Sequence, residues 1–313
     1  MTASAPPRIA RGQTIGIVAP AGPVNVERLH RGLARLGDTF VVRIADNILA
    51  ERSRETPSYL AASDAARAAE LNAMLADPDV RAIILARGGY GIMRILRELD
   101  ASLLARDPKP IVGFSDATAL LAWAHRAGVR GIHGPVAVQL GDLPDGDLAQ
   151  LVTLLTDPHP PGPRPWSLTS HGTGVHTGAL IPANLTLASM LVGTPWALPL
   201  EGAIALFEEV GEKPYELDRY LTQLGLTNAL LETRAVILGE LLRCTDPQPP
   251  AGGADADDAA LRTILERLHA AGLPVASGAP IGHGTRNEAV PFGARCELDL
   301  DRNTFAILEA AVA

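Results

Sequence analysis

The sequence predicts an α/β protein of two domains, the first of which holds an open, mostly parallel sheet with flanking helices. Short apolar runs alternate with helical stretches through the first half of the chain, as in βαβ units. Two of these runs, at residues 81–86 and 111–112, end directly in turns of small residues. The 313 residues are enough for two cores of ordinary size. We expect residues 1–156 to form the first domain and a smaller, mixed, β-rich domain with helices to follow.

Each element of the first domain follows from residue type and spacing. Residues 15–19 are mostly apolar and stop at Pro20, which is typical of a short buried strand. Residues 26–36 carry apolar side chains at helical spacing, and Ser63 is a good cap for an alanine-rich helix over 63–75. The same reasoning predicts strands at 40–44, 81–86, 111–112 and 131–136, and helices at 92–99 and 117–127.

The second domain follows a stretch, 157–176, that is rich first in proline and then in Gly, Ser, Thr and His. This composition predicts a linker, so we expect the second domain to span 177–313. Its predicted elements are an apolar run at 178–184 leading to a helix at 185–191, a strand at 202–210, a helix from Pro214, a strand at 235–239, a surface loop at 246–258, a helix at 259–271, a strand or loop at 274–284, and a hairpin of 291–300 with 305–308.

Composition and charge exclude several classes of protein. Hydrophobic residues make up 47% and charged residues 20% of the chain, and the net charge is -8, so nucleic acid is not an expected partner. No apolar stretch approaches the roughly 18 residues of a membrane span. The N-terminal apolar run is too short for a signal peptide, and Cys244 and Cys296 lack metal-ligand or redox spacing. We therefore expect a cytoplasmic protein with free thiols.

Ser115 is the first candidate catalytic residue. The sequence from Pro110 to Leu121 reads as a strand that breaks abruptly into a helix, and Ser115 sits at the break. This arrangement is close to the nucleophile elbow, although Ala117 stands where the G-x-S-x-G pattern has glycine. The alternative interpretation is that Ser115 caps the helix and Asp116 is favoured by the helix dipole.

A glycine-rich turn follows the strand at 81–86. Gly88, Gly89 and Gly91 match neither the dinucleotide-binding spacing nor a phosphate loop with its lysine. Glycines in such a turn let backbone N–H groups approach a ligand. This turn and the Ser115 turn should lie at the same carboxyl edge of the sheet, where open α/β sheets bind ligands. For His133, on the next predicted strand, a structural role is favoured over ligand contact.

Two features of the second half of the chain also bear candidate side chains. The strand at 202–210 ends with the adjacent carboxylates Glu208 and Glu209, which must point to opposite faces, one of them inward. Such residues are more often solvated or cap-like than functional. His283 is flanked by glycines and so is less easily explained as core packing.

Taken together, the motifs resemble the LD-carboxypeptidase family of serine peptidases. The resemblance rests on four motifs in the family's order, which are Arg87-Gly-Gly-Tyr-Gly91, Gly113-Phe-Ser-Asp116, Leu206-Phe-Glu-Glu-Val-Gly-Glu-Lys-Pro-Tyr215 and Gly282-His-Gly284. It extends from residues 18–22 through 193–196 to 291–294. It implies a cytoplasmic, homodimeric carboxypeptidase that uses no metal or other cofactor and releases the terminal D-alanine of murein tetrapeptides in peptidoglycan recycling.

The resemblance also implies roles for individual residues. It makes Ser115 the nucleophile, His283 the general base and Glu208 the acid of a triad, with the N–H groups of Gly89 and Asp116 as the oxyanion hole. The chemistry agrees, because a serine hydroxyl needs a base that is itself oriented by an acid. The candidates for substrate contact are Gly88, Tyr90, Asn184 and Arg219, and the terminal carboxylate could be held by Arg87, Arg94 or Arg219.

Two departures from the family pattern and two rival functions remain open. Glu209 stands where the family often has Asp, and Pro182 and Ala183 stand where two glycines are expected before Asn184. The chain also resembles the microcin-immunity peptidases, which share the fold and triad but hydrolyse a peptidyl-nucleotide toxin. The rival from another class is a non-catalytic α/β protein that binds a small molecule and uses Ser115 as a plain helix cap.

Overall fold

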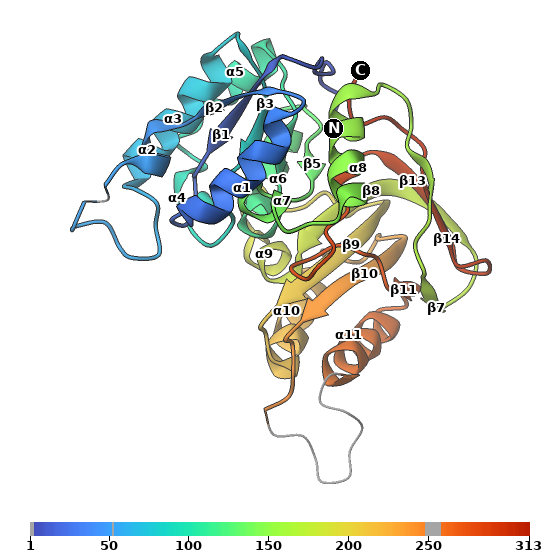
Figure 1. Ribbon diagram of the computed structural model, residues 1–313. Coiled ribbons are helices and arrows are strands. Elements are labelled where there is room, and N and C mark those ends of the chain that lie inside the picture. The colour runs from blue at the N-terminus through green and yellow to red at the C-terminus, as the bar shows by residue number, and fades with distance from the viewer. Residues whose placement is uncertain (1–2, 52, 248–257) are drawn as a thin grey trace. The chain divides into compact units, whose positions relative to one another are not determined.

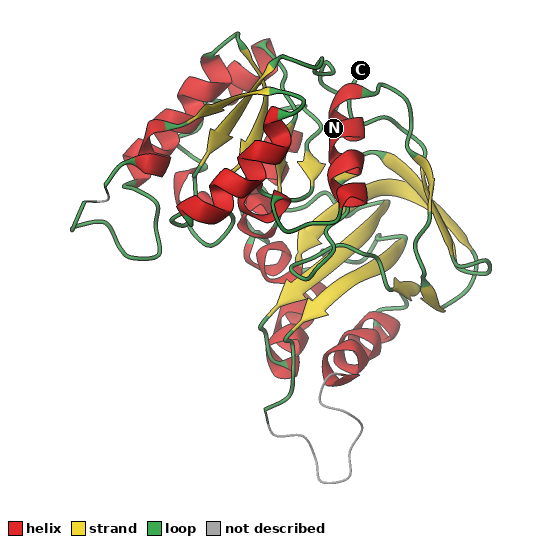
Figure 2. Ribbon diagram, in the orientation of Figure 1, coloured by secondary structure: helices red, strands yellow, loops and turns green. Residues whose placement is uncertain are grey.

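The computed structural model describes residues 3–51, 53–247 and 258–313. It divides into two compact units, each with its own sheet (Figures 1 and 2). Unit 1 comprises residues 1–159, 288–293 and 310–313, and unit 2 comprises residues 160–287 and 294–309. Most of the loop predicted at 246–258 lies outside the described residues.

Unit 1 contains a six-stranded sheet with the order β12-β5-β4-β3-β1-β2. Its first five strands along the chain pair in parallel, and β12 joins β5 in the antiparallel direction. The strands are β1 (Thr14–Val18), β2 (Val41–Ile44), β3 (Val80–Leu85), β4 (Ile111–Gly113), β5 (Ile132–His133) and β12 (Val290–Pro291). The mostly parallel α/β sheet predicted for the first half of the chain is confirmed.

Helices connect these strands in the βαβ manner. They are α1 (Val26–Gly37), α2 (Asp46–Leu49), α3 (Asp64–Ala76), α4 (Ile92–Ile95), α5 (Ala101–Arg106), the 3-10 turn η1 (Ser115–Ala117), α6 (Thr118–Arg126), α7 (Ala137–Leu140) and α8 (Asp145–Thr156). Helix α1 packs on α7, and α3 packs on α4 and α5. The predicted cap of α3 is confirmed, because Ser63 accepts a hydrogen bond from Ala66 N.

The central strands of unit 1 are mostly apolar because both faces of the sheet are covered. Ile83, Ile84 and Leu85 of β3 are inaccessible to solvent, as are Ile111 and Val112 of β4. Strands β3 and β4 are neighbours and run in parallel, so their carboxyl ends meet at one edge of the sheet. The turns that follow them carry the first group of candidate residues.

Unit 2 contains a mixed eight-stranded sheet with the order β6-β14-β13-β8-β9-β10-β11-β7. This agrees with the mixed, β-rich second domain that the sequence predicts. Strands β8 to β11 pair in parallel and the others in antiparallel fashion. The strands are β6 (Gly162–Arg164), β7 (Thr169–His171), β8 (Val175–Asn184), β9 (Ala203–Val210), β10 (Ala235–Leu242), β11 (Val275–Ser277), β13 (Arg295–Asp299) and β14 (Thr304–Ile307). The helices are α9 (Leu185–Met190), α10 (Pro214–Leu226) and α11 (Asp258–Ala270), and α10 packs on both others.

Two expectations for this part of the chain need correction. The stretch 157–176 is not simply a linker, because it supplies β6 and β7, the two edge strands of the second sheet. The proline-rich composition is compatible with β6 because an edge strand can leave one side of its backbone unpaired. The predicted closing hairpin exists as β13 and β14, but residues 290–291 before it form β12 in the sheet of unit 1.

No helix in the described ranges is both long enough and apolar enough to cross a membrane.

Candidate active site

Ser115 lies at a strained turn between β4 and α6. Its φ is +61°, in the left-handed region that costs a residue with a side chain roughly 1–2 kcal/mol. Gly113 is needed two residues earlier, because a Cβ there would lie 2.7 Å from the Cβ of Ala117. Strain of this kind persists where the surrounding structure enforces it and is concentrated at functional sites. The local backbone therefore has the character of a nucleophile elbow, with Ala117 tolerated in place of the second glycine.

The cap interpretation of Ser115 is wrong. The residue at the N-cap position of η1 is Phe114, and α6 begins after Ala117 without a side-chain cap. In the described part of unit 1, the Oγ atom of Ser115 makes no hydrogen bond. The side chain is half-buried. The hydroxyl of Ser115 therefore does not cap the start of η1 or of α6.

The glycine turn after β3 touches the Ser115 turn. A Cβ on Gly88 would lie 3.1 Å from the Cβ of Ser115, so only a residue without a side chain fits comfortably. Gly89 and Gly91 have φ values of +113° and +132°, which glycine adopts readily. The N–H of Gly89 donates no hydrogen bond among the described residues. The expected meeting of the two turns at one sheet edge is confirmed.

Asp116 links these two turns through its side chain. Its Oδ2 accepts a hydrogen bond from the backbone N–H of Ile92 at 2.9 Å, and the residue is 2% exposed. Burial raises the pKa of Asp116 to about 6, although the N–H groups of Ile92 and Gly91 and the charge of Arg67 act in the opposite direction. The residue that follows Ser115 is thus fastened to the end of the glycine turn.

Arg67 is a residue of this site that the sequence reasoning missed. Its guanidinium is inaccessible to solvent and donates to the carbonyl oxygens of Pro20 and Gly91, the latter at 3.0 Å. It also contacts the carboxylate of Asp64. The sequence places an arginine within the predicted alanine-rich helix, which is the one feature that could have indicated it. Its acceptors are backbone carbonyl oxygens of two turns distant in sequence, and no sequence pattern indicates these.

In unit 2, the buried Glu208 pairs with the half-buried His283. Oε2 of Glu208 lies 2.7 Å from Nδ1 of His283, and the carboxylate is inaccessible to solvent. Burial lowers the pKa of His283, but the hydrogen bond and charge of Glu208, with the charges of Glu209 and Glu240, raise it above its usual value overall. Among the described residues, Oε1 of Glu208 has no hydrogen-bond partner. The pair has the geometry of an imidazole oriented by an acid.

Glu209 is buried as well, so the expectation that only one of the two carboxylates would face inward is wrong. Its oxygens accept from Asn184 Nδ2 at 2.8 Å, from the N–H and hydroxyl of Thr186, and from its own neighbour Val210 N. Burial raises the pKa of Glu209, and the charge of Glu208 adds to this effect. Both faces of β9 are covered, which leaves neither side chain in solvent.

Asn184 has clear structural partners. Besides its bond to Glu209, its Oδ1 caps α9 by accepting from Leu187 N at 3.2 Å. Pro182 and Ala183 continue β8 in regular pairing with β9, so their departure from the expected glycines causes no irregularity in the strand. The proposed contact of Asn184 with substrate stays a prediction.

The remaining candidates are distributed over the two units. Tyr90 is 51% exposed and packs edge-on against Tyr59. Arg87 donates to the carbonyl of Pro23 at 2.8 Å, whereas Arg94 pairs with Asp64 at 2.8 Å. Arg219 is exposed on α10, with its guanidinium over the ring of Tyr215.

His133 and the two cysteines have structural surroundings. His133 is inaccessible to solvent and lies edge-on to the ring of Phe114, as its favoured structural role requires. Cys244 and Cys296 are buried free thiols. Within the described ranges, no group of three or more His, Cys, Asp or Glu side chains is arranged to hold a metal ion.

The sequence matches two family domains in order. Residues 15–134 match the LD-carboxypeptidase N-terminal domain, and residues 177–298 match the LD-carboxypeptidase C-terminal domain. A protein of Streptomyces coelicolor is 38% identical over 311 residues, which cover 96% of this chain and 95% of that protein. The murein tetrapeptide carboxypeptidase of Pseudomonas aeruginosa is 32% identical over 298 residues, which cover 92% of this chain and 94% of the relative.

Solved structures share the fold over nearly the whole chain. The muramoyltetrapeptide carboxypeptidase of Oxalobacter formigenes superposes with a TM-score of 0.80 at 27% identity and covers 95% of this chain and 99% of its own. The microcin C7 self-immunity protein MccF, solved with glutamyl sulfamoyl guanosine, gives a TM-score of 0.85 at 23% identity, with 99% of both chains covered. At that identity, the likeness to MccF concerns the fold alone.

Proposed function

Because the chain belongs to the LD-carboxypeptidase family, we propose that it is a serine carboxypeptidase that releases the terminal D-alanine from murein tetrapeptides. The observation that carries the proposal is the contact of His283 with the buried Glu208. A histidine whose Nδ1 contacts a carboxylate inaccessible to solvent has the acid partner that orients a general base. The similarity to the Pseudomonas murein tetrapeptide carboxypeptidase supports the choice of substrate.

In the proposed reaction, the Oγ atom of Ser115 attacks the carbonyl carbon that joins the third residue of the peptide to D-alanine. His283 takes the hydroxyl proton at Nε2, and Glu208 holds the ring through Nδ1. The tetrahedral intermediate collapses when His283 gives that proton to the amine of D-alanine, which leaves as the C–N bond breaks. Water then attacks the acyl-enzyme by the same route and regenerates the hydroxyl of Ser115.

The oxyanion that develops on the carbonyl oxygen is assigned to the N–H groups of Gly89 and Asp116. Both belong to the two turns that meet beside Ser115. The Asp116 N–H lies in the first turn of a helix, where N–H groups have no partner within the helix. Loss of one such donor costs roughly 10²–10³ in kcat. The placement of these turns therefore adds a contribution to the rate that is separate from that of the triad.

The proposal is tested by incubating the protein with murein tetrapeptide and measuring free D-alanine and tripeptide. The wild type should release D-alanine, and Ser115→Ala should reduce kcat by at least about 10⁴-fold while the protein remains folded. Equal turnover by a folded Ser115→Ala variant would refute the role of Ser115. Cleavage of an aminoacyl sulfamoyl nucleotide with no release of D-alanine would instead favour the microcin-immunity activity. The homodimer and the cytoplasmic location remain predictions.

A further inference from the structure

Strand β10 carries an irregularity near its carboxyl end. It pairs regularly with β9 as far as Leu238 and resumes in a shifted register at Leu241. Shifts of this type re-aim the side chains at the irregularity and are over-represented next to active sites. Glu240 lies within the shift and is half-buried, and its backbone N–H donates to the carbonyl of Ile281 at 2.8 Å. The shifted part of β10 thus holds the beginning of the segment 281–284.

The side chain of Glu240 holds the other end of the same segment. Its Oε2 accepts a hydrogen bond from the N–H of Gly284 at 2.6 Å. A hydrogen bond to a carboxylate is shorter and stronger than one between neutral groups. His283 therefore lies on a four-residue segment that one residue, Glu240, fixes at both ends.

The glycines on both sides of His283 are explained by Glu240. A Cβ on Gly282 would lie 2.8 Å from the Cβ of Glu240, and a Cβ on Gly284 would lie 2.4 Å from its Oε2. Gly282 also has a φ of +153°. A side chain at position 282 would meet the Cβ of Glu240, and one at position 284 would displace its carboxylate from the N–H, which accounts for the Gly-His-Gly motif.

Glu240 also contributes to the charge around the imidazole. The charged groups that raise the pKa of His283 are Glu208 and Glu209 on β9 and Glu240 on the neighbouring β10. Glu208 acts through a direct hydrogen bond, whereas Glu240 acts through its charge on His283. Removal of the Glu240 charge should therefore favour the neutral imidazole.

We propose that Glu240 is the positioning residue of His283, which fixes the segment 281–284 from both ends and so aims the imidazole at Glu208. The proposal rests on the proposed function only for the statement that His283 is the base. The positioning itself stands on the hydrogen bonds, the register shift of β10 and the two glycines.

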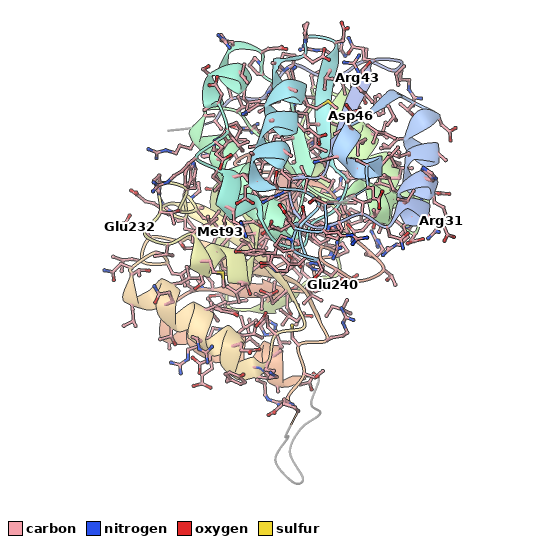
Figure 3. All side chains as sticks on the ribbon, turned by 90° about the vertical axis from the view of Figure 1, so that its left-hand side faces the viewer. Arg31, Arg43, Asp46, Met93, Glu232 and Glu240 are labelled. Carbon is pink, nitrogen blue, oxygen red and sulfur yellow. The ribbon has the colours of Figure 1, made fainter. Side chains whose placement is uncertain are left out.

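Three substitutions separate the contributions of Glu240. Glu240→Ala removes the carboxylate, Glu240→Gln keeps an oxygen that can accept from Gly284 N, and Glu232→Gln makes the same charge change at an exposed residue ahead of β10. Figure 3 labels Glu240 and Glu232. Since a misplacement of about 1 Å can cost 10²-fold in rate, Glu240→Ala should lower kcat by roughly 10²-fold. KM should stay within about twofold, Glu240→Gln should recover most of kcat, and Glu232→Gln should match the wild type.

A nuclear magnetic resonance readout of His283 does not depend on activity. The ring resonances, assigned by comparison with His283→Ala, should titrate at a lower pH in Glu240→Ala and Glu240→Gln than in the wild type. The downfield Nδ1–H resonance of the bond to Glu208 should be lost in Glu240→Ala and kept in Glu240→Gln. If the wild type releases no D-alanine, the proposed function fails, but these resonances still test the positioning.

Two results would overturn the positioning role. One is a folded Glu240→Ala variant in which the His283 resonances are those of the wild type, whatever its kcat. The other is equal loss of the Nδ1–H resonance in Glu232→Gln. If Glu240→Ala does not fold, Gly284→Ala replaces it, because the new methyl group would push the carboxylate off its N–H partner. The downfield Nδ1–H resonance should then be lost in Gly284→Ala, as expected for Glu240→Ala, and an Nδ1–H resonance kept as in the wild type would equally refute the proposal.

Discussion

The carboxylate of Asp116 accepts the backbone N–H of Ile92 at 2.9 Å and thereby joins the turn of Ser115 to the glycine turn after β3. Asp116 is adjacent to Ser115 in sequence, whereas Ile92 follows Gly91. The two assigned oxyanion donors, the N–H groups of Gly89 and Asp116, are therefore held by turns that one buried side chain connects. This connection leads to the first predictions.

Asp116→Ala should lower kcat by roughly 10²-fold, because the two turns would no longer be tied and one oxyanion donor would lose its position. KM should change much less. Steady-state release of D-alanine from murein tetrapeptide measures both constants. Asp116→Asn is the matched control, since its amide oxygen can still accept from Ile92 N, and it should retain most of the activity. Similar losses in the two variants would contradict the linking role.

Asp116→Asn should also alter the pH dependence of stability. The folded-state pKa of about 6 lies above the usual 3.8, so the wild type binds this proton more tightly when folded. Ionisation of the buried carboxyl therefore costs stability, by roughly 3 kcal/mol at most, as the pH rises from 4 to above 6. In urea unfolding, the free energy of unfolding of Asp116→Asn should exceed that of the wild type at pH 8 but not at pH 4. A gain independent of pH would show that this ionisation is not responsible.

The rate should depend on the protonation of His283. The base must be neutral, and the Glu208 contact raises the pKa of His283 despite its burial, so kcat/KM should rise with pH through a value above 6.5. Glu208→Gln removes the charge that raises the pKa of His283 against the effect of burial. The acid limb of the pH profile, where kcat/KM rises with pH, should therefore shift to lower pH. The substitution should also cut kcat by about 10²–10⁴-fold, because the acid that fixes the ring is lost. An acid limb that does not move in Glu208→Gln would argue against the assignment of this pair.

Arg67→Lys should reduce both stability and kcat. A single lysine ammonium cannot replace three guanidinium nitrogens, of which Nη1 donates to Pro20 O and Gly91 O, Nε to Ala62 O and Nη2 to Asp64, so at least one acceptor would lose its partner. An unsatisfied buried group costs about 1–3 kcal/mol. Chemical denaturation and D-alanine release measure the two effects. Arg126→Lys, on α6, is a surface control for the same exchange and should leave both unchanged.

Gly113→Ala should destabilise the protein by about 1–3 kcal/mol, because the new methyl group would lie 2.7 Å from the Cβ of Ala117. The turn that presents Ser115 would have to shift, so kcat should fall as well. Gly146→Ala provides the control, since no atom lies within 4 Å of its Cβ position on α8. That change should instead stabilise the helix by about 0.5–1 kcal/mol. Equal melting temperatures for the two variants would contradict the steric account.

The fold was largely predictable because each parallel strand of unit 1 can be recognised from its own short stretch of sequence. Apolar runs such as Ile83 to Leu85 end in turns of small residues, and parallel topology brings those turns to one edge. The stretch 157–176 was misread because proline content is a local property, whereas the edge position of β6 that tolerates it depends on the whole sheet.

The site was predictable only in part. Ser115 could be found from its own turn, but Glu208 and His283 lie 75 residues apart, and only the family resemblance joined them in advance. Arg67 and Glu240 remained undetected because each acts on the backbone of a distant turn. Almost every residue type has the same backbone N–H and carbonyl groups, so partners of this kind have no sequence pattern that could be recognised.

Unit 1 is not contiguous along the chain, since its sheet takes β12 from residues 290–291. Residues 310–313 return to it as well, where Ala313 N donates to Pro6 O and Arg130 contacts Ala310 O. During translation, the sheet of unit 1 can therefore be completed only after residues 290–291 have left the ribosome. A chain terminated before residue 290 would thus lack a strand of the unit whose first residues were made first.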